Sequence, residues 1–140
     1  MEPTVRFAFP EEAGLVIALW TEAGAAPSAT DSVEWVEVLA TRQDAWVLLA
    51  EVEGRVVGTL FVTFDGWRGH FYRLAVLPRF RRRGIALQLV REGERLLRDA
   101  GASRVAAIVL DDREDALAFW LAAGFAHQIE ATRFTKFLGK

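Results

Sequence analysis

Residues 74–86 read Leu-Ala-Val-Leu-Pro-Arg-Phe-Arg-Arg-Arg-Gly-Ile-Ala, and the rest of the chain is best interpreted outward from this stretch. An apolar run ends at Pro78, an arginine-rich turn follows, and Gly84 precedes a long amphipathic pattern. A strand that leads through a glycine-bearing turn into a helix presents unpaired backbone N–H groups and the positive end of the helix dipole. The stretch therefore predicts a site for a compact anion, most naturally a pyrophosphate.

Positive charge is concentrated around this stretch. The chain has a formal net charge of −2, yet residues 68–91 contain seven arginines and no acidic residue. A charge run is often only a solvated face, but the adjoining glycine and helix start favour an anion site. An acidic chain without a recognition-helix pattern argues against nucleic acid as the partner.

Composition excludes several other kinds of chemistry. The chain has 140 residues, of which 52% are hydrophobic, and this predicts one compact domain over residues 1–140. It has no cysteine and two histidines, so disulfides, a thiol nucleophile and a histidine-rich metal site are not expected. No apolar run is long enough to span a bilayer and no secretory signal is visible, so we expect a cytoplasmic protein that does not associate with membranes.

The hydrophobic periodicity predicts a mixed α/β domain. Three strands joined by short turns imply an antiparallel meander, and later strands alternate with amphipathic helices. The expected order is β-α-α-β-β-β-α-β-α-β-β, a mixed, mostly antiparallel sheet flanked by helices. The expected strands are Val5–Phe9, Ala45–Val52, Arg55–Phe64, His70–Leu77, Arg104–Leu110, Ala126–Glu130 and Arg133–Phe137. The expected helices run from Pro10 to about Ala23, from a cap at Asp31 or Ser32 to about Ala40, from Ile85 to Ala100, and from a cap at Asp111–Asp112 to Gly124.

Two separated motifs resemble those of the GNAT superfamily of N-acetyltransferases. Arg81, Gly84 and Ala86 fill the Arg/Gln-x-x-Gly-x-Gly/Ala acyl-CoA motif, after a strand with the family's apolar-Ala-Val-x-Pro ending. Residues 116–125 resemble the family's Ala-x-x-aromatic-aromatic-x-x-x-Gly-Phe pattern. Together with an element order that matches nearly the whole chain, the motifs imply a GNAT domain.

The resemblance implies that acetyl-CoA binds between two splayed strands, the one ending at Val76 and the strand 104–110. Its pantetheine arm is expected along the backbone of residues 74–76, and its pyrophosphate on the N–H groups of residues 81–86. The Val76 N–H is the expected donor to the oxyanion. The expected cofactor-binding residues are Leu74, Ala75, Val76, Arg81, Arg82, Arg83, Gly84, Ile85, Ala86, Arg113 and Trp120.

The sequence departs from the family pattern where the catalytic acid and base are expected. Trp120 stands where many members have a tyrosine that protonates the thiolate, Arg113 replaces an asparagine, and residues 70–77 lack the family's glutamate base. His70 has a suitable pKa for a base, and Tyr72 is expected to share a face with it. An exposed His70, a packing role for Tyr72, and proton relay through water are the alternatives.

The acceptor pocket is expected between the first two helices and the final hairpin. Acidic residues near these helices would suit a cationic amine, although packing or capping explains each side chain as well. The predicted function is transfer of an acetyl group from acetyl-CoA to a primary amine of a small molecule or a protein; the alternative is a non-catalytic acyl-CoA-binding module. Exposed edges of the last two strands leave room for a homodimer. The proposed wall residues are Trp20, Glu22, Asp31, Trp35, Trp67 and His127.

Overall fold

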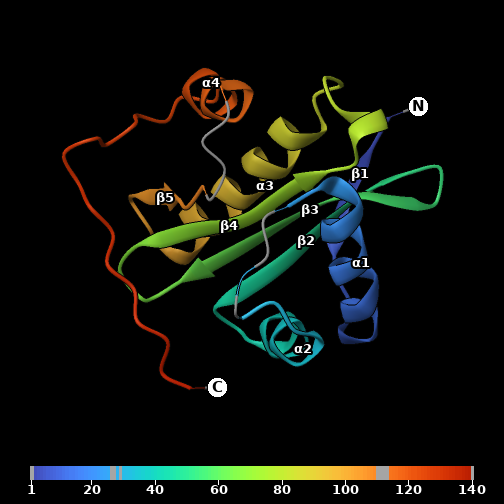
Figure 1. The fold of residues 1–140 in the computed structure, drawn as a ribbon, viewed down its shortest axis with the longest axis horizontal. Coiled ribbons are helices and arrows are strands. Elements are labelled where there is room, and N and C mark those ends of the chain that lie inside the picture. Colours follow the sequence, from blue (N-terminus) through green and yellow to red (C-terminus); the bar gives the residue numbers. More distant parts are fainter. Residues whose placement is uncertain (1, 26–27, 29, 110–113, 140) are drawn as a thin grey trace.

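The computed structural model describes residues 2–25, 28, 30–109 and 114–139. These residues form one five-stranded sheet in the order β1-β2-β3-β4-β5, flanked by helices on both faces (Figure 1). The first three strand pairs are antiparallel and β4–β5 is parallel, so the mixed, mostly antiparallel sheet is confirmed. The elements are β1 Thr4–Phe7, η1 Pro10–Glu12, α1 Ala13–Ala23, α2 Val33–Thr41, β2 Ala45–Val52, β3 Arg55–Phe64, β4 Gly69–Val76, η2 Pro78–Phe80, α3 Ile85–Ala100, β5 Val105–Ala107 and α4 Glu114–Ala122.

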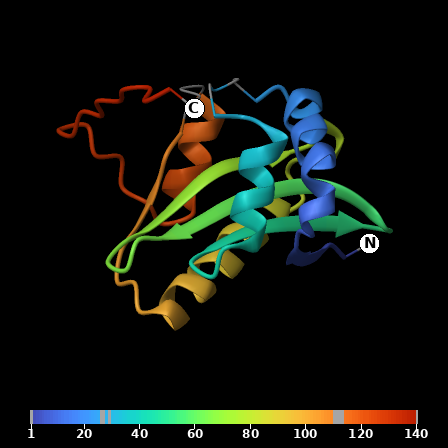
Figure 2. The same ribbon diagram turned by 90° about the horizontal axis from the view of Figure 1, so that it is seen from below.

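The two faces of the sheet are covered by different helices. Along β3, Phe61 packs against Trp20 of α1, with ring centroids 5.1 Å apart, while Val62 faces Gly93 of α3. Successive side chains of a strand point to opposite faces, so α1 and α3 lie on opposite sides of the sheet. Figure 2 shows α1 and α2 together on one side of the sheet and α3 on the other.

α3 approaches the sheet closely because Gly93 has no side chain. A Cβ built at Gly93 would lie 2.7 Å from Cε1 of Phe71 and 3.2 Å from Cγ2 of Val62. Phe71 is fully buried and its far side reaches Trp120 and Phe125, whose rings lie 6.4 and 6.2 Å away. The hydrophobic core therefore continues from α3 through β4 to α4.

The predicted final strands, Ala126–Glu130 and Arg133–Phe137, are wrong. Residues 126–139 form neither a helix nor a strand, and Figure 1 shows them swinging away from the sheet. A strand needs a partner, and β5 pairs over only three residues, too short an edge to hold a hairpin. Their apolar side chains are consequently exposed, Phe134 to 90%. The strand edges that suggested a homodimer are absent with them, and the homodimer stays a prediction.

The remaining boundaries differ by a few residues. β1 ends at Phe7 instead of Phe9, because Phe9 is the residue that caps η1. β5 covers residues 105–107 of the expected 104–110, and the predicted cap at Asp111–Asp112 lies outside the described residues. None of the helices in the described part of the chain is long and apolar enough to cross a membrane.

Candidate functional site: a pocket between β4, β5 and the start of α3

β4 and β5 are joined along only half of β4. The parallel pairing covers residues 69–71 of β4, and the last bond is from Ile108 N to the Phe71 carbonyl, 3.0 Å. In the described part of the chain no strand pairs with residues 74–76 on the β5 side. The sheet is therefore open beside the second half of β4, as the predicted splay requires.

The backbone of Val76 faces this opening. Leu77 N donates to the Val57 carbonyl of β3 at 2.9 Å, and Gly58 stands opposite Val76 in the ladder. Because hydrogen-bonded and non-hydrogen-bonded pairs alternate in an antiparallel ladder, the N–H and C=O of Val76 point away from β3. The carbonyl accepts a bond from Arg81 Nε at 2.9 Å, which leaves the N–H directed into the opening.

A β-bulge lies immediately before these residues. The β3–β4 register shifts between Thr59 and Phe61, and Arg73 has a φ of +58°. A bulge bends its strand and increases the local twist. Residues 74–76, which follow the bulge, are the part of β4 with which β5 does not pair.

The turn after β4 leaves backbone N–H groups free at the start of α3. Gln88 N donates to the Gly84 carbonyl, 3.0 Å, as the first bond of the helix, so the N–H groups of residues 85–87 have no partner within it. Gly84, the N-cap, has no side chain to cap them and has a φ of +80°. A Cβ at Gly84 would meet nothing within 4 Å, so open space lies in front of these groups. This geometry fits a phosphate group.

Of the four predicted arginines, the three in the described part of the chain lie in different surroundings. Arg81 joins the end of β4 to the end of α1, since its side chain donates to the carbonyls of Val76 and of Ala23 at 2.9 and 2.8 Å. Its own N–H donates to the Pro78 carbonyl, so the free N–H groups of the turn begin at Arg82. Arg82 lines the pocket, whereas Arg83 does not and stacks over Phe80 at 5.2 Å. Arg113 lies outside the described residues.

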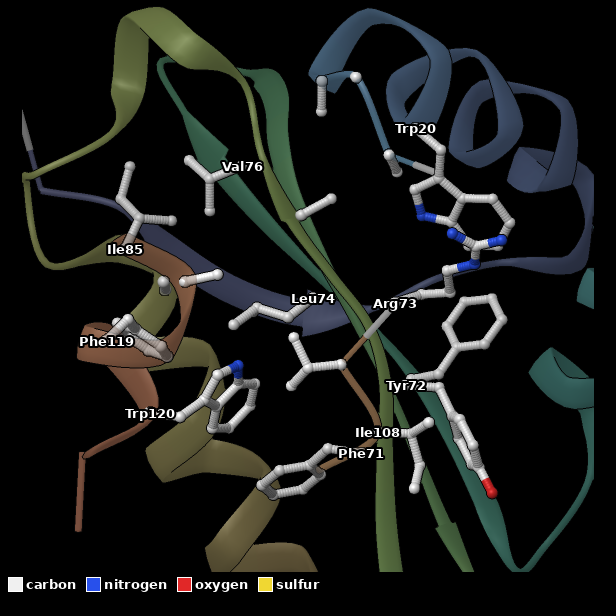
Figure 3. A pocket seen from close by; sticks show the side chains of 18 of the residues that line it. Trp20, Phe71, Tyr72, Arg73, Leu74, Val76, Ile85, Ile108, Phe119 and Trp120 are labelled. Carbon is white, nitrogen blue, oxygen red and sulfur yellow. The ribbon is translucent and has the colours of Figure 1, made fainter. Parts of the chain in front are cut away.

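α4 closes the far side of the opening with aromatic rings. Trp120 contacts Phe119 and Phe125 edge-to-face, with centroids 5.2 and 4.9 Å apart. Arg91 of α3 donates to the Ala123 carbonyl, 3.2 Å, and fixes the end of α4 against α3. Figure 3 shows Phe119 and Trp120 on the same side of β4 as Leu74 and Ile85.

These elements enclose a pocket of about 970 Å³ that extends to both sides of β4. One side holds the predicted cofactor residues. On the other side Figure 3 shows Trp20, Tyr72 and Arg73. Of the predicted cofactor-binding residues, the lining includes Leu74, Ala75, Val76, Arg81, Arg82, Gly84, Ile85, Ala86 and Trp120.

The two candidate proton carriers are adjacent but only one reaches the pocket. His70 and Tyr72 share a face of β4, with stacked rings 6.0 Å apart. Tyr72 lines the pocket. His70 stands opposite Thr63 and is not among the described lining residues.

The proposed acceptor wall is partly assembled. Trp20, Asp31 and Trp35 line the pocket, while Glu22 forms an ion pair with Arg55, 3.3 Å, outside it. The two other residues lie apart from this wall. Trp67 lies in an exposed turn beneath Arg68, and His127 belongs to the exposed segment after α4.

Two polar residues of the central strands were missed as site residues: Arg73, which lines the pocket, and Thr59, which does not line it but is bonded to the lining residues Trp20 and Arg73. Thr59 is fully buried; it accepts a bond from Trp20 Nε1 and donates to the Arg73 carbonyl, both at 3.0 Å. Arg73 forms an ion pair with Asp31, and its side chain is only 11% exposed. The signals in the sequence are a threonine within the otherwise apolar residues 56–62 of β3 and an arginine between Tyr72 and Leu74 in β4.

Comparison with known proteins agrees with this geometry. The model of the acetyltransferase (GNAT) family matches residues 15–125. The chain belongs to the GNAT family. It is 37% identical over 99 residues to acetyltransferase plu1384 of Photorhabdus laumondii, covering 71% of this chain and 69% of that one.

Solved structures of this GNAT fold are similar over almost the whole chain. Aminoglycoside 6'-N-acetyltransferase AAC(6')-Ih of Acinetobacter baumannii has a TM-score of 0.78 at 20% identity, over 99% of this chain and 100% of that one. Aminoglycoside N-acetyltransferase AAC(6')-Iy, solved with CoA, has a TM-score of 0.80 at 16% identity, over 96% and 95%. At these identities the likeness shows the fold alone.

Family membership supports acetyl-CoA as the co-substrate and acetyl transfer as the general reaction. The free N–H groups at the start of α3, the open space before Gly84 and the Val76 N–H fit the diphosphate and thioester ends of that molecule. Within the described residues no group of three or more histidines or acids is placed to hold a metal ion.

Proposed function

We propose that this protein is an N-acetyltransferase that moves the acetyl group of acetyl-CoA directly to a primary amine. The observation that carries the proposal is the alignment of two sets of unpaired N–H groups along one opening. The Val76 N–H lies on β4, and the N–H groups of residues 85–87 lie at the start of α3. The Val76 N–H suits a thioester oxygen, and the N–H groups of residues 85–87 suit a diphosphate. These are the groups at the two ends of acetyl-CoA.

The reaction forms a C–N bond and breaks the C–S bond of the thioester. The attacking nitrogen must be neutral, so an ammonium first loses a proton, and the leaving thiolate later gains one. The Val76 N–H is the donor to the oxygen on which negative charge develops in between. A donor fixed in the strand requires no reorganisation when that charge appears.

Proton transfer is assigned to Tyr72 or to water. Tyr72 lines the pocket and Trp120 has an indole N–H, a poor acid, in the position where many members have tyrosine. His70 stacks on Tyr72 but is not among the described lining residues, so any part it takes in proton transfer requires a bridging water. If Tyr72 is the acid, Tyr72→Phe should lower kcat about 100-fold and leave KM for acetyl-CoA unchanged. A wild-type rate would assign the proton to water.

The experiment is a thiol-release assay over a panel of amines, with mass spectrometry of the acetylated products and calorimetry with acetyl-CoA. We expect micromolar to millimolar binding of acetyl-CoA, release of one thiol per amide formed, and no release without amine. A protein that binds acetyl-CoA and acetylates no amine would instead be the non-catalytic acyl-CoA-binding module.

A further inference from the structure

Beyond β4 the pocket continues into an apolar compartment, which we call the acceptor half. It is formed on the α1–α2 face of the sheet by Trp20, Trp35, Leu39, Phe61 and Tyr72. We propose that it takes a monoamine with an apolar aliphatic or aromatic body and rejects amines that carry a second cationic nitrogen. This inference rests on the proposed function, because it names the acceptor class of the same site.

The five side chains that define the acceptor half present mainly carbon surface. Trp20 is buried, and its only polar atom already donates to Thr59 Oγ1 at 3.0 Å. Its indole and the Phe61 ring contact edge-to-face, and Phe61 stands opposite Tyr72 in the ladder. Trp35, 45% exposed on α2, lies toward the mouth. Such a surface gains free energy from covering an apolar ligand and little from a charged one.

The negative charge of Asp31, the acidic residue of this compartment, is already neutralised by a neighbouring arginine. Asp31 Oδ2 forms an ion pair with Arg73 and accepts a second bond from Ser28 N at 2.9 Å. Of the two predicted caps of α2, Asp31 and Ser32, the structure uses Ser32, which accepts from Trp35 N. The Arg73 guanidinium also lies 5.0 Å from the centroid of the Trp20 ring. Figure 3 shows these two side chains next to each other. The carboxylate is therefore held by a buried cation.

The charge of the whole described lining has the wrong sign for a polycation. Two acids line it, Asp31 and Asp115, and the second lies at the start of α4 on the cofactor side. The other acids expected to attract a cationic amine are elsewhere: Glu22 is paired with Arg55, and Glu34 and Glu37 are not lining residues. Against these two acids stand four arginines, at positions 73, 81, 82 and 133.

A single amine and a diamine therefore meet different conditions. The nitrogen that attacks the thioester is neutral at that moment, and the rest of a monoamine can fill the aromatic compartment. A second ammonium keeps its charge and must be desolvated beside Arg73, where the described lining offers only the carboxylate of Asp31, already paired with Arg73. The pocket thus discriminates by the charge of the acceptor's distal end.

The test compares hexylamine with hexamethylenediamine, which has the same chain and one additional amino group. We expect kcat/KM for hexylamine to be at least about tenfold higher, from thiol release at saturating acetyl-CoA. In parallel, calorimetry with the CoA-bound protein should show the same order of affinities. Equal or better use of the diamine would overturn the inference and leave the N-acetyltransferase proposal standing. Selective binding of hexylamine without any acetylation would support the inference about the acceptor class and overturn the N-acetyltransferase proposal. Binding of neither amine would overturn the inference.

The Arg73→Gln variant tests whether the Arg73–Asp31 ion pair causes the preference for the monoamine. It leaves Asp31 as an uncompensated acid beside Trp20, so the preference should move toward the diamine by about tenfold. The matched control is the double variant Arg73→Gln with Asp31→Asn, which lacks both charges and should keep the order of the wild type. The same order in all three proteins would show that this ion pair does not set the specificity, and would overturn the inference.

Discussion

Gly84 combines two properties that make it the most informative single residue of the cofactor side. It has a φ of +80°, which side chains other than glycine adopt only at a cost, and a side chain placed there would enter the space before the α3 N–H groups. Binding of a diphosphate needs that space. The residue therefore links backbone geometry directly to the co-substrate.

Gly84→Glu should weaken acetyl-CoA binding by at least about 100-fold, because the side chain fills the phosphate position and adds a negative charge. Calorimetry measures the affinity, and circular dichroism checks the fold. The matched control is Gly54→Glu, a turn glycine with the same φ of +80° and open space, remote from the pocket. It should cost about 1–2 kcal/mol of stability and no affinity. Wild-type affinity for acetyl-CoA in the Gly84→Glu variant would contradict the assignment of the diphosphate site to the start of α3.

For single residues, the sequence predicted the roles of backbone groups better than the pairing of side chains. Gly84 and Val76 follow from a strand, a turn and a helix start, which are local features. The Asp31–Arg73 ion pair joins residues 42 positions apart, and only the fold brings them together. The sequence predicted Asp31 or Ser32 as a helix cap and Asp31 as a wall residue, because the distant partner Arg73 is not visible within its own stretch.

At the scale of elements, the fit of α3 on β4 decides the shape of the pocket wall. Gly93 lets the helix reach Phe71, and Phe71 in turn supports Trp120. The protein interior is close-packed, so a displacement of α3 would reach Trp120 through these contacts.

Gly93→Ala should destabilise the protein by about 1–3 kcal/mol in urea unfolding, because its methyl group would overlap the Phe71 ring. Gly14→Ala is the control within a helix, since a Cβ at Gly14 meets nothing within 4 Å. It should be neutral or stabilising by up to about 1 kcal/mol. Equal effects of the two substitutions would contradict the close contact of α3 with β4.

Element prediction succeeded where a segment carries its own pattern and failed where it depends on a partner. β2, β3 and α3 have the predicted bounds, because their periodicity and the turn glycines are local signals. Residues 126–130 and 133–137 have a strand-like composition as well, but β5 offers them only a short edge. Exposed side chains such as Ile129 and Phe134 show that composition alone does not bury a strand.

At the scale of the whole molecule, one ion network joins the N-terminal segment to the sheet. Arg6 of β1 donates to Glu12 at 2.7 Å and to Glu51 of β2 at 2.8 Å, and Phe9 N donates to Glu12 at 2.9 Å. The hydrogen bond from Arg6 is the largest influence on the pKa of Glu12 and lowers it. Burial opposes this shift, and the bond from the Phe9 backbone adds a smaller lowering. Lowering a carboxyl pKa in the folded state links stability to pH.

Glu12→Gln should therefore lower stability by roughly 0.5–1 kcal/mol at pH 7. Because the folded pKa is depressed, this contribution is present above the unfolded pKa, about 4.3, and is lost as the pH falls below it toward the folded value. Urea unfolding at pH 7 and pH 3 measures the difference, which should shrink at pH 3. Glu11→Gln, an exposed neighbour, is the control. A difference that stays constant with pH would contradict the network.

The order of the strands could be predicted from the sequence because hairpins and crossovers leave few alternatives. The openness of the sheet beside residues 74–76 could be expected only through the family resemblance, since it depends on the bulge at Arg73. The central claim is the proposal that both ends of acetyl-CoA bind along this opening.

Hydrogen–deuterium exchange with and without acetyl-CoA tests that claim most directly. In the free protein the amides of Val76 and of residues 82–87 should exchange quickly, since they face the opening or precede the first bond of α3. Acetyl-CoA should slow exchange in both segments together, with little change around Arg6 and Glu51 on the far side of the molecule. Unchanged exchange at Val76 and residues 82–87 in the saturated protein would contradict the account.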